Sequence, residues 1–95
     1  MDIDRWQRMF FMAVNRKYPS KWTTEQRLLA IQRQIADVSH THQFGELGGI
    51  SIKGRIAGIF PDLFMLCEQH GMDLNEELKS ILDWFNSNAP PTTRG

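Results

Sequence analysis

The chain has 95 residues, 41% hydrophobic and 23% charged, a composition typical of one small folded domain rather than a disordered protein. Eleven basic and eleven acidic side chains give a formal net charge of zero, which excludes a general attraction to nucleic acid or anionic membrane. Because Cys67 is the only cysteine, an intrachain disulfide and a four-cysteine zinc site are also excluded.

Two amphipathic helices are predicted in the N-terminal half of the chain. Apolar residues recur at helical spacing from residue 3 to about residue 17, and Pro19 interrupts the pattern. Thr23, followed three positions later by Gln26, has the form of a capping box, so a second helix is expected over residues 24 to 39. The next dozen residues contain three glycines and no lasting period, which predicts a long loop.

Two further helices are predicted in the C-terminal half. Apolar spacing returns over residues 52 to 70, and Pro61 predicts a kink there because proline lacks the backbone N–H that a helix uses. Gly71 is well placed to end this third helix, and Asp73 is a suitable N-cap for the fourth, over residues 74 to 86.

The predicted architecture is therefore all-α, a single four-helix domain over residues 1 to 86. Residues 87 to 95 contain two prolines and nothing large to bury, so a flexible tail is expected. The first five residues lack the basic start and apolar run of a signal peptide, and no apolar stretch approaches the roughly 20 residues that span a bilayer. We expect a cytoplasmic protein that does not use a membrane or nucleic acid as partner.

Two stretches of the sequence have a distinctive arrangement. One runs from Arg55-Ile56-Ala57-Gly58-Ile59 to Leu66-Cys67-Glu68-Gln69-His70-Gly71-Met72-Asp73-Leu74. The other consists of Trp22, Leu28-Leu29-Ala30-Ile31 and the segment from Gln32 to Val38. Together they resemble the MazG-like nucleoside triphosphate pyrophosphohydrolases, whose helices carry an E-E-x-x-E motif, then an E-x-x-D motif, an apolar run and an L-G-I-D-L-like turn. The resemblance covers about residues 3 to 85 and implies a four-helix fold and at least a dimer.

In that family the acidic motifs bind magnesium, which holds the triphosphate while water attacks and pyrophosphate leaves. Aligned on the Gly71 turn, the resemblance places Arg55 and Gly58 at the E-x-x-D positions. It places Arg33 and Gln34 at the paired glutamates and leaves Asp37 as the only retained acidic ligand candidate. Permanent positive charge at these positions opposes a divalent cation, so we expect no metal site, no catalytic residues and no cofactor.

Asp62 is the alternative ligand if the alignment slips. That register puts Pro61 beside the ligand and shortens the run to Gly71 by a helical turn, and the first register is therefore preferred. His40 and His42 lie close together, but no acidic or cysteine ligand set accompanies them, and they are interpreted as loop residues.

Two interpretations of the arginines remain open. In the simpler one, Arg33 and Asp37 form an intrahelical ion pair, four residues apart, and Arg55 is solvated. In the other, Arg33 and Arg55 bind phosphate directly in place of the lost metal. Trp22, in the connector that leads to this region, is the candidate contact for a base or another substrate group.

The sequence favours a MazG-like helical protein with a degenerate metal site, acting as a non-catalytic nucleotide-binding or structural homo-oligomer. Two alternatives stay open. One is an active nucleotide pyrophosphohydrolase with non-standard ligands, which would need magnesium. The other is a helical adaptor that binds another protein through exposed aromatic side chains. A helix-turn-helix that binds DNA is disfavoured, because the last helix offers only Lys79 as a cation.

Overall fold

The computed structural model describes residues 2–19, 21–46 and 48–87. Over these residues the chain is helical and contains no strand, which confirms the all-α prediction. The helices are α1 (Ile3–Lys17), α2 (Thr24–Phe44), α3 (Ile52–Ala57), α4 (Phe60–Gln69) and α5 (Leu74–Phe85). With α3 and α4 counted as two parts of one broken helix, the order matches the four predicted helices; the predicted tail falls outside the described residues from position 88 onward.

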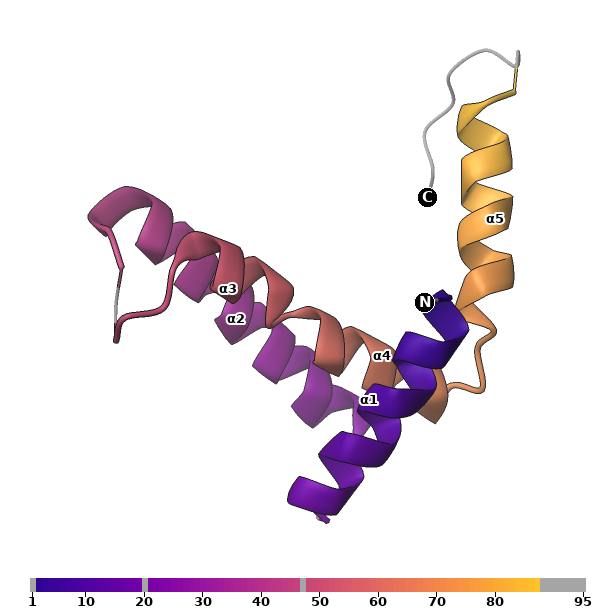
Figure 1. Ribbon diagram of the computed structural model, residues 1–95, viewed down its shortest axis with the longest axis horizontal. Helices are drawn as coiled ribbons and strands as arrows, with labels where there is room; N and C mark the ends of the chain where they lie inside the picture. Colours follow the sequence, from indigo (N-terminus) through magenta and orange to yellow (C-terminus); the bar gives the residue numbers. More distant parts are fainter. Residues whose placement is uncertain (1, 20, 47, 88–95) are drawn as a thin grey trace.

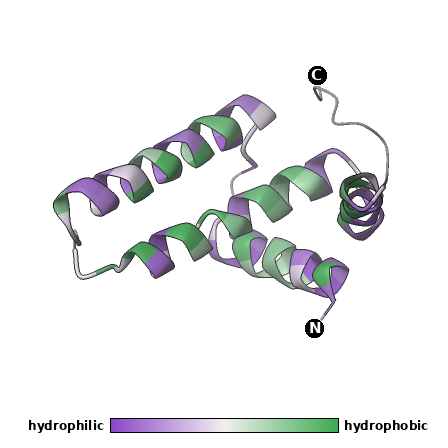
Figure 2. Cartoon of the chain, turned by 90° about the horizontal axis from the view of Figure 1, so that it is seen from above, coloured by the Kyte–Doolittle hydropathy of each residue, from purple (hydrophilic) through white to green (hydrophobic). Residues whose placement is uncertain are grey.

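The helices form two layers and one projecting arm. α2 runs beside α3 and α4, and α1 packs across α4 at the end of this pair (Figure 1). α5 packs against α1 and then runs away from the other helices (Figure 1). Seen from above, α5 is viewed end-on at the edge of the molecule (Figure 2). Among the described residues, no helix is both long enough and apolar enough to cross a membrane.

The helix ends that have a local sequence signal form as predicted. The Thr23 hydroxyl accepts a hydrogen bond from the Gln26 backbone N–H at 3.2 Å, and the Gln26 side chain accepts one from the Thr23 N–H at 2.9 Å. The Asp73 carboxylate accepts from the N–H of Glu76 at 3.2 Å at the start of α5. Gly71 follows α4 with a φ of 61°, in the left-handed region that favours glycine.

One predicted boundary is wrong, and one predicted interruption is defined more closely. α2 continues five residues beyond the predicted end, to Phe44, so His40 and His42 are helical and the predicted loop is shorter. Nothing in this stretch breaks a helix before Gly45, whose φ of 92° ends it. The expected interruption near Pro61 is present as a break at residues 58 to 59. Pro61 itself occupies the first turn of α4, where a missing N–H has no partner to lose.

The hydrophobic core of one chain is small. Its buried apolar side chains are Ile31, Phe64, Met65 and Cys67. The Phe10 ring of α1 stacks on the Phe64 ring of α4 with 5.6 Å between centroids, which joins the two layers. Many other large apolar side chains remain more than one third exposed, including several on α5, so the helices of a single chain leave much of their apolar surface uncovered.

Candidate functional site

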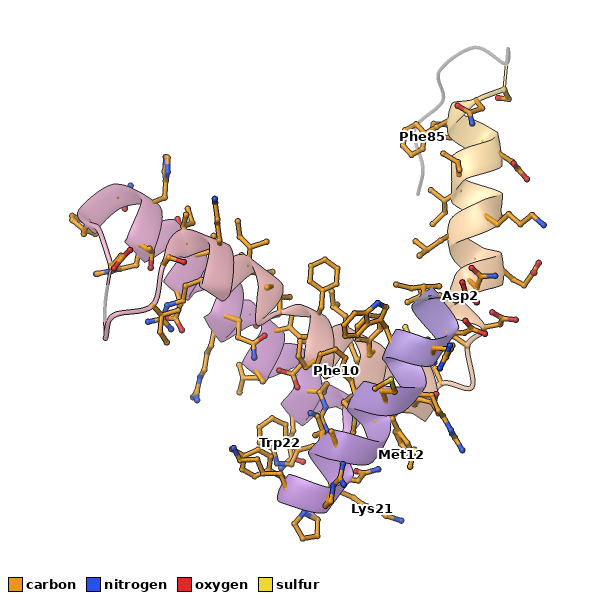
Figure 3. The ribbon with its side chains drawn as sticks, viewed as in Figure 1. Asp2, Phe10, Met12, Lys21, Trp22 and Phe85 are labelled. Atoms are coloured by element: carbon orange, nitrogen blue, oxygen red, sulfur yellow. The ribbon has the colours of Figure 1, made fainter. Side chains whose placement is uncertain are left out.

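A groove beside Trp22 brings aromatic, charged and amide side chains together. It has a volume of about 500 Å³ and is bounded by the end of α1, the connector to α2, and the facing sides of α2 and α4. Its lining includes Tyr18, Trp22, Arg27, Ala30, Gln34 and Asp62. We call it the Trp22 groove; Figure 3 shows Trp22 beside the C-terminal end of α1.

A buried ion pair forms the inner wall of this groove. Arg27 Nη1 donates to Asp62 Oδ1 at 2.6 Å, and the two side chains are only 7% and 14% exposed. Gln34 Nε2 donates to the other carboxylate oxygen, Oδ2, at 2.5 Å. The Arg27 guanidinium also lies 4.9 Å from the centroid of the Trp22 ring, a cation–π distance. Both oxygens of Asp62 are therefore engaged by side chains of α2.

The fold explains why these groups meet. Arg27 and Gln34 are seven residues apart, two helical turns, so they project from the same side of α2. Asp62 lies in the first turn of α4, where a negative charge is favoured by the helix dipole. Trp22 is held in place because Gln69 Nε2 donates to its carbonyl oxygen at 2.6 Å. This hydrogen bond fixes the connector between α1 and α2 to the C-terminal end of α4.

A second, weaker ion pair lies further along α2. Arg55 Nη1 of α3 is 3.9 Å from Asp37 Oδ2, with the Asp37 side chain 55% exposed and that of Arg55 22% exposed. Asp37 thus pairs with Arg55 across two helices, and within the described part of the chain no ion pair joins it to Arg33. The interpretation in which Arg55 is solvated and Arg33 pairs with Asp37 is wrong, because Arg55 is largely buried and is itself the ion-pair partner of Asp37.

The three predicted ligand-binding residues lie at different positions along the length of α2 and do not share one pocket. Trp22 lines the groove, whereas Arg55 lies at the Asp37 end. Arg33 is exposed and lies three residues after Ala30 and four before Asp37, which places it on the side of α2 that borders the groove. From Arg27 to Asp37 the helix rises about 15 Å. The arrangement is therefore an aromatic groove continued by a row of two arginines.

Magnesium, which the resemblance implies for an enzyme, does not fit these residues. Asp62 is fully engaged by Arg27 and Gln34, and Asp37 faces Arg55. Across the described ranges, no group of three or more His, Cys, Asp or Glu side chains converges on a point that a metal ion could occupy. A hard cation needs several oxygen ligands, and here each carboxylate of the site has an arginine as its neighbour.

Sequence reasoning missed Arg27 and treated Asp62 only as a ligand in a slipped alignment. A signal was present, since Arg27 is four residues before the core residue Ile31 and shares its buried side of α2. A charged residue inside an apolar stripe requires a partner of opposite charge. The partner could not be identified, because Asp62 is 35 residues away in sequence.

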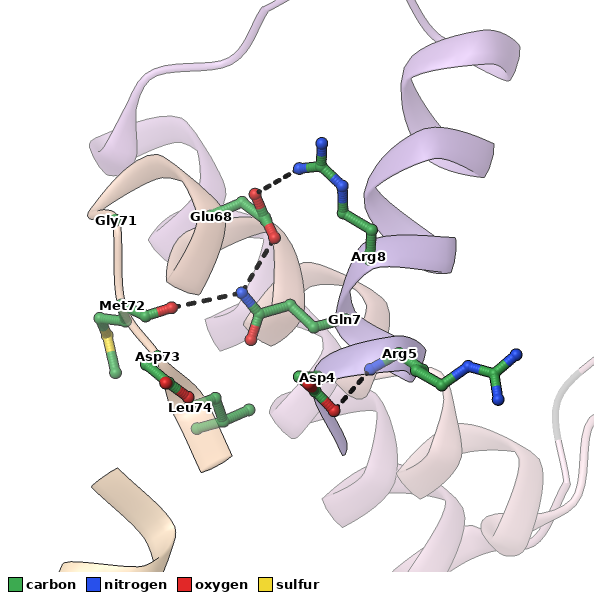
Figure 4. Close-up of a pocket in the computed structure, with 9 residues that line it drawn as sticks. All are labelled: Asp4, Arg5, Gln7, Arg8, Glu68, Gly71, Met72, Asp73 and Leu74. Atoms are coloured by element: carbon green, nitrogen blue, oxygen red, sulfur yellow. Dashed lines mark hydrogen bonds and ion pairs between the residues drawn. The ribbon is translucent and has the colours of Figure 1, made fainter. Parts of the chain in front are cut away.

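A second polar cluster joins α1 to the turn between α4 and α5 (Figure 4). The Gln7 side chain is buried, and its Nε2 donates to Glu68 Oε1 at 3.1 Å and to the Met72 carbonyl at 3.5 Å. Arg8 Nη1 lies 3.4 Å from Glu68 Oε2. All these contacts are made within the chain, and they fix the position of the turn from which α5 starts.

Comparison of the chain with protein-family models, curated proteins and solved structures gave no match.

Proposed function

We propose that this chain is a non-catalytic MazG-like domain that binds a nucleotide without a metal ion, along the Trp22 groove and the adjacent side of α2. The observation that carries the proposal is the buried Arg27–Asp62 pair beside Trp22. It supplies a rigid, charged inner wall next to an aromatic ring while leaving no carboxylate for magnesium. A MazG-like domain altered in this way keeps a place for a nucleotide but loses the means to hydrolyse it.

The aromatic end of the groove suits a nucleobase. Trp22 is 43% exposed and Tyr18 62% exposed, so both rings have surface available for stacking. Stacking of a base on an aromatic side chain contributes about 1–3 kcal/mol and depends little on which base is present. The groove volume of about 500 Å³ is within the usual range for small-molecule sites.

The phosphates of the nucleotide would extend along α2 toward Arg33 and Arg55. Guanidinium groups bind phosphate through paired hydrogen bonds and carry a charge at every physiological pH. Arg33 is exposed on the side of α2 that borders the groove, and the 3.9 Å contact of Arg55 with Asp37 is long enough for a phosphate to compete with it. Phosphate binding by these residues would therefore need no magnesium.

Binding is tested by titrating the purified chain with nucleoside mono-, di- and triphosphates, in magnesium and in excess chelator, and following Trp fluorescence and thermal melting. We expect a rise in melting temperature that is the same in both buffers, since a ligand of the folded state stabilises it. Arg33→Ala should weaken binding of the phosphorylated ligands by about tenfold or more. Arg5→Ala is the matched control, an exposed arginine on the distant end of α1. Binding that appears only with magnesium, or no binding at millimolar nucleotide, would refute the proposal.

The two other functions differ from this proposal in what they require. An active pyrophosphohydrolase would need carboxylates supplied from elsewhere, for example by a second chain. A protein-binding adaptor is supported by the exposed apolar side chains of α2, α4 and α5.

A further inference from the structure

A line of four exposed residues runs along the outer side of α1: Arg5, Met9, Met12 and Arg16. They follow one another at steps of four, three and four residues, the spacing of side chains that share one side of a helix. Gln7 and Phe10, whose side chains contact α4, lie on the opposite side of α1. α1 crosses in front of α4 in Figure 1, so its outer side is a surface of the molecule. We call this line the outer seam.

The centre of the outer seam is apolar. Met9 is 50% exposed and Met12 59% exposed, and Trp6, three residues before Met9, is 42% exposed. The side of a surface helix that faces only solvent ordinarily carries charged and polar residues. Methionine, tryptophan and arginine are instead enriched at protein–protein interfaces, and the flexible methionine side chain adapts to apolar partners of irregular shape. The composition of the outer seam is therefore that of a binding surface.

The two ends of the outer seam are positively charged. Arg5 and Arg16 are exposed, and within the described part of the chain no ion pair joins either of them to a carboxylate. Figure 4 shows the Arg5 guanidinium directed away from the carboxylates of Glu68 and Asp73. Eleven residues separate the two arginines, which places them about 16 Å apart along the helix axis. The seam therefore offers one available cation on each side of its methionines.

The position of these charges decides which kind of partner fits. Two copies of the outer seam would repel each other, because arginine faces arginine in either orientation of the two helices. A flat anionic membrane fits poorly, since Arg5 and Arg16 lie on the same line as the methionines, whereas a membrane-surface helix separates its apolar and basic sides. A helix with an apolar centre and a carboxylate near each end matches both the apolar and the charged parts of the seam.

We propose that the outer seam of α1 binds an acidic amphipathic helix of another protein. Apolar side chains of that helix lie against Met9 and Met12, and a carboxylate near each of its ends pairs with Arg5 or Arg16. Among the described residues that line the Trp22 groove, none belongs to the outer seam. The protein partner and a nucleotide can therefore bind at the same time.

The first test measures the affinity of a labelled helical peptide for the full chain by fluorescence anisotropy. The peptide has about five turns, leucines on one side of its central turns, and one glutamate at each end of that side, at the spacing of Arg5 and Arg16. A reference peptide carries lysine in place of each glutamate. We expect the acidic peptide to bind about tenfold more tightly or better, with a smaller difference at high salt because exposed charges are screened.

Substitutions in the seam identify the surface that binds. Arg5→Glu combined with Arg16→Glu should reverse the preference in favour of the lysine peptide, and Met9→Ala combined with Met12→Ala should weaken the binding of both peptides by about tenfold. Lys53→Glu is the control, an exposed cation on α3 whose substitution should change neither affinity. Far-ultraviolet circular dichroism checks that each variant remains helical. If the double glutamate variant does not fold, Arg5→Gln with Arg16→Gln should abolish the preference instead.

Vesicles containing phosphatidylserine and sedimentation of the chain alone test the other occupants. Equal affinity for the two peptides, or a preference that the arginine substitutions leave unchanged, would overturn the proposal. So would binding to the vesicles without binding to the acidic peptide, which would assign the seam to a membrane surface. A dimer that Met9→Ala with Met12→Ala dissociates would assign the seam to a second copy of the chain and would also overturn it.

Discussion

Arg27 and Asp62 form a 2.6 Å ion pair whose side chains are both almost excluded from solvent, and this pair joins α2 to α4. Ion pairs of this kind contribute little when compared with a well-packed apolar pair, but removing one partner leaves an uncompensated buried charge. The pair therefore controls the stability of the domain as well as the shape of the Trp22 groove.

Asp62→Ala should lower the free energy of unfolding by about 3–5 kcal/mol, because Arg27 then has no counter-ion. Arg27→Met combined with Asp62→Leu should cost less than either single substitution, since no charge remains buried. Asp37→Ala serves as the control: its side chain is half exposed and 3.9 Å from Arg55, so its removal should cost no more than about 1 kcal/mol. Urea unfolding measures all of these. Equal losses for Asp62→Ala and Asp37→Ala would contradict the difference in burial.

Gly71→Ala should destabilise the chain by about 1–2 kcal/mol through the backbone alone. The residue has a φ of 61°, and an added Cβ would meet no atom within 4 Å, so no steric clash contributes. Gly71→Asn should recover part of the loss, because asparagine tolerates the left-handed region. Thermal unfolding of the two variants provides the measurement, and a Gly71→Asn variant less stable than Gly71→Ala would argue against this explanation.

The chain should not release pyrophosphate from common nucleoside triphosphates in the presence of magnesium. Without a bound divalent ion, the attacking water and the leaving pyrophosphate lack their main electrostatic stabilisation. A coupled phosphate assay measures pyrophosphate release over hours at micromolar protein, and the expected rate equals that of buffer without protein. Release that chelator abolishes and Asp37→Ala eliminates would show that Asp37 is a ligand and that the degenerate-site proposal is incorrect.

Stability should fall at alkaline pH because of Cys67. Burial raises the pKa of this thiol above its ordinary value, so the folded chain holds the proton more strongly than the unfolded chain does. The contribution is fully present below about pH 8.5, the ordinary thiol pKa, and is lost as the pH rises through the raised value. Urea unfolding from pH 7 to pH 10 should show a smaller decline for Cys67→Ala than for the original chain. An identical decline in the two proteins would exclude the thiol as its source.

The features that were predictable from sequence are those with local causes. The caps at Thr23 and Asp73 and the turn at Gly71 each depend on residues within four positions. The position of the helix break was not predictable in the same way, because Pro61 permits two readings, a kink or a helix start. The structure selects the helix start, with the break two residues earlier.

The charge pairs depend on tertiary structure and could not be assigned from sequence. Asp37 has Arg33 one turn away on its own helix, yet it pairs with Arg55, because α3 folds back along α2. The spacing rule for ion pairs within a helix does not weigh a cation from a neighbouring helix. The same limit applies to the apolar faces: the periodicity of α5 is evident in the sequence, but its separation from the rest of the chain is not.

The lengthened α2 has a consequence for how the molecule opens. Its C-terminal half makes its main contacts with α3, and α3 is joined to α4 only through the break at residues 58 to 59 (Figure 1). The C-terminal half of α2 and α3 therefore form a unit that can unfold while the α1–α4 contact and the Phe10–Phe64 stack persist. Backbone amides of residues 38 to 46 and 48 to 57 should therefore exchange with deuterium through local opening, at rates that vary little with denaturant. Those of α4 should exchange only when the whole domain unfolds, so that one chain contains two levels of protection.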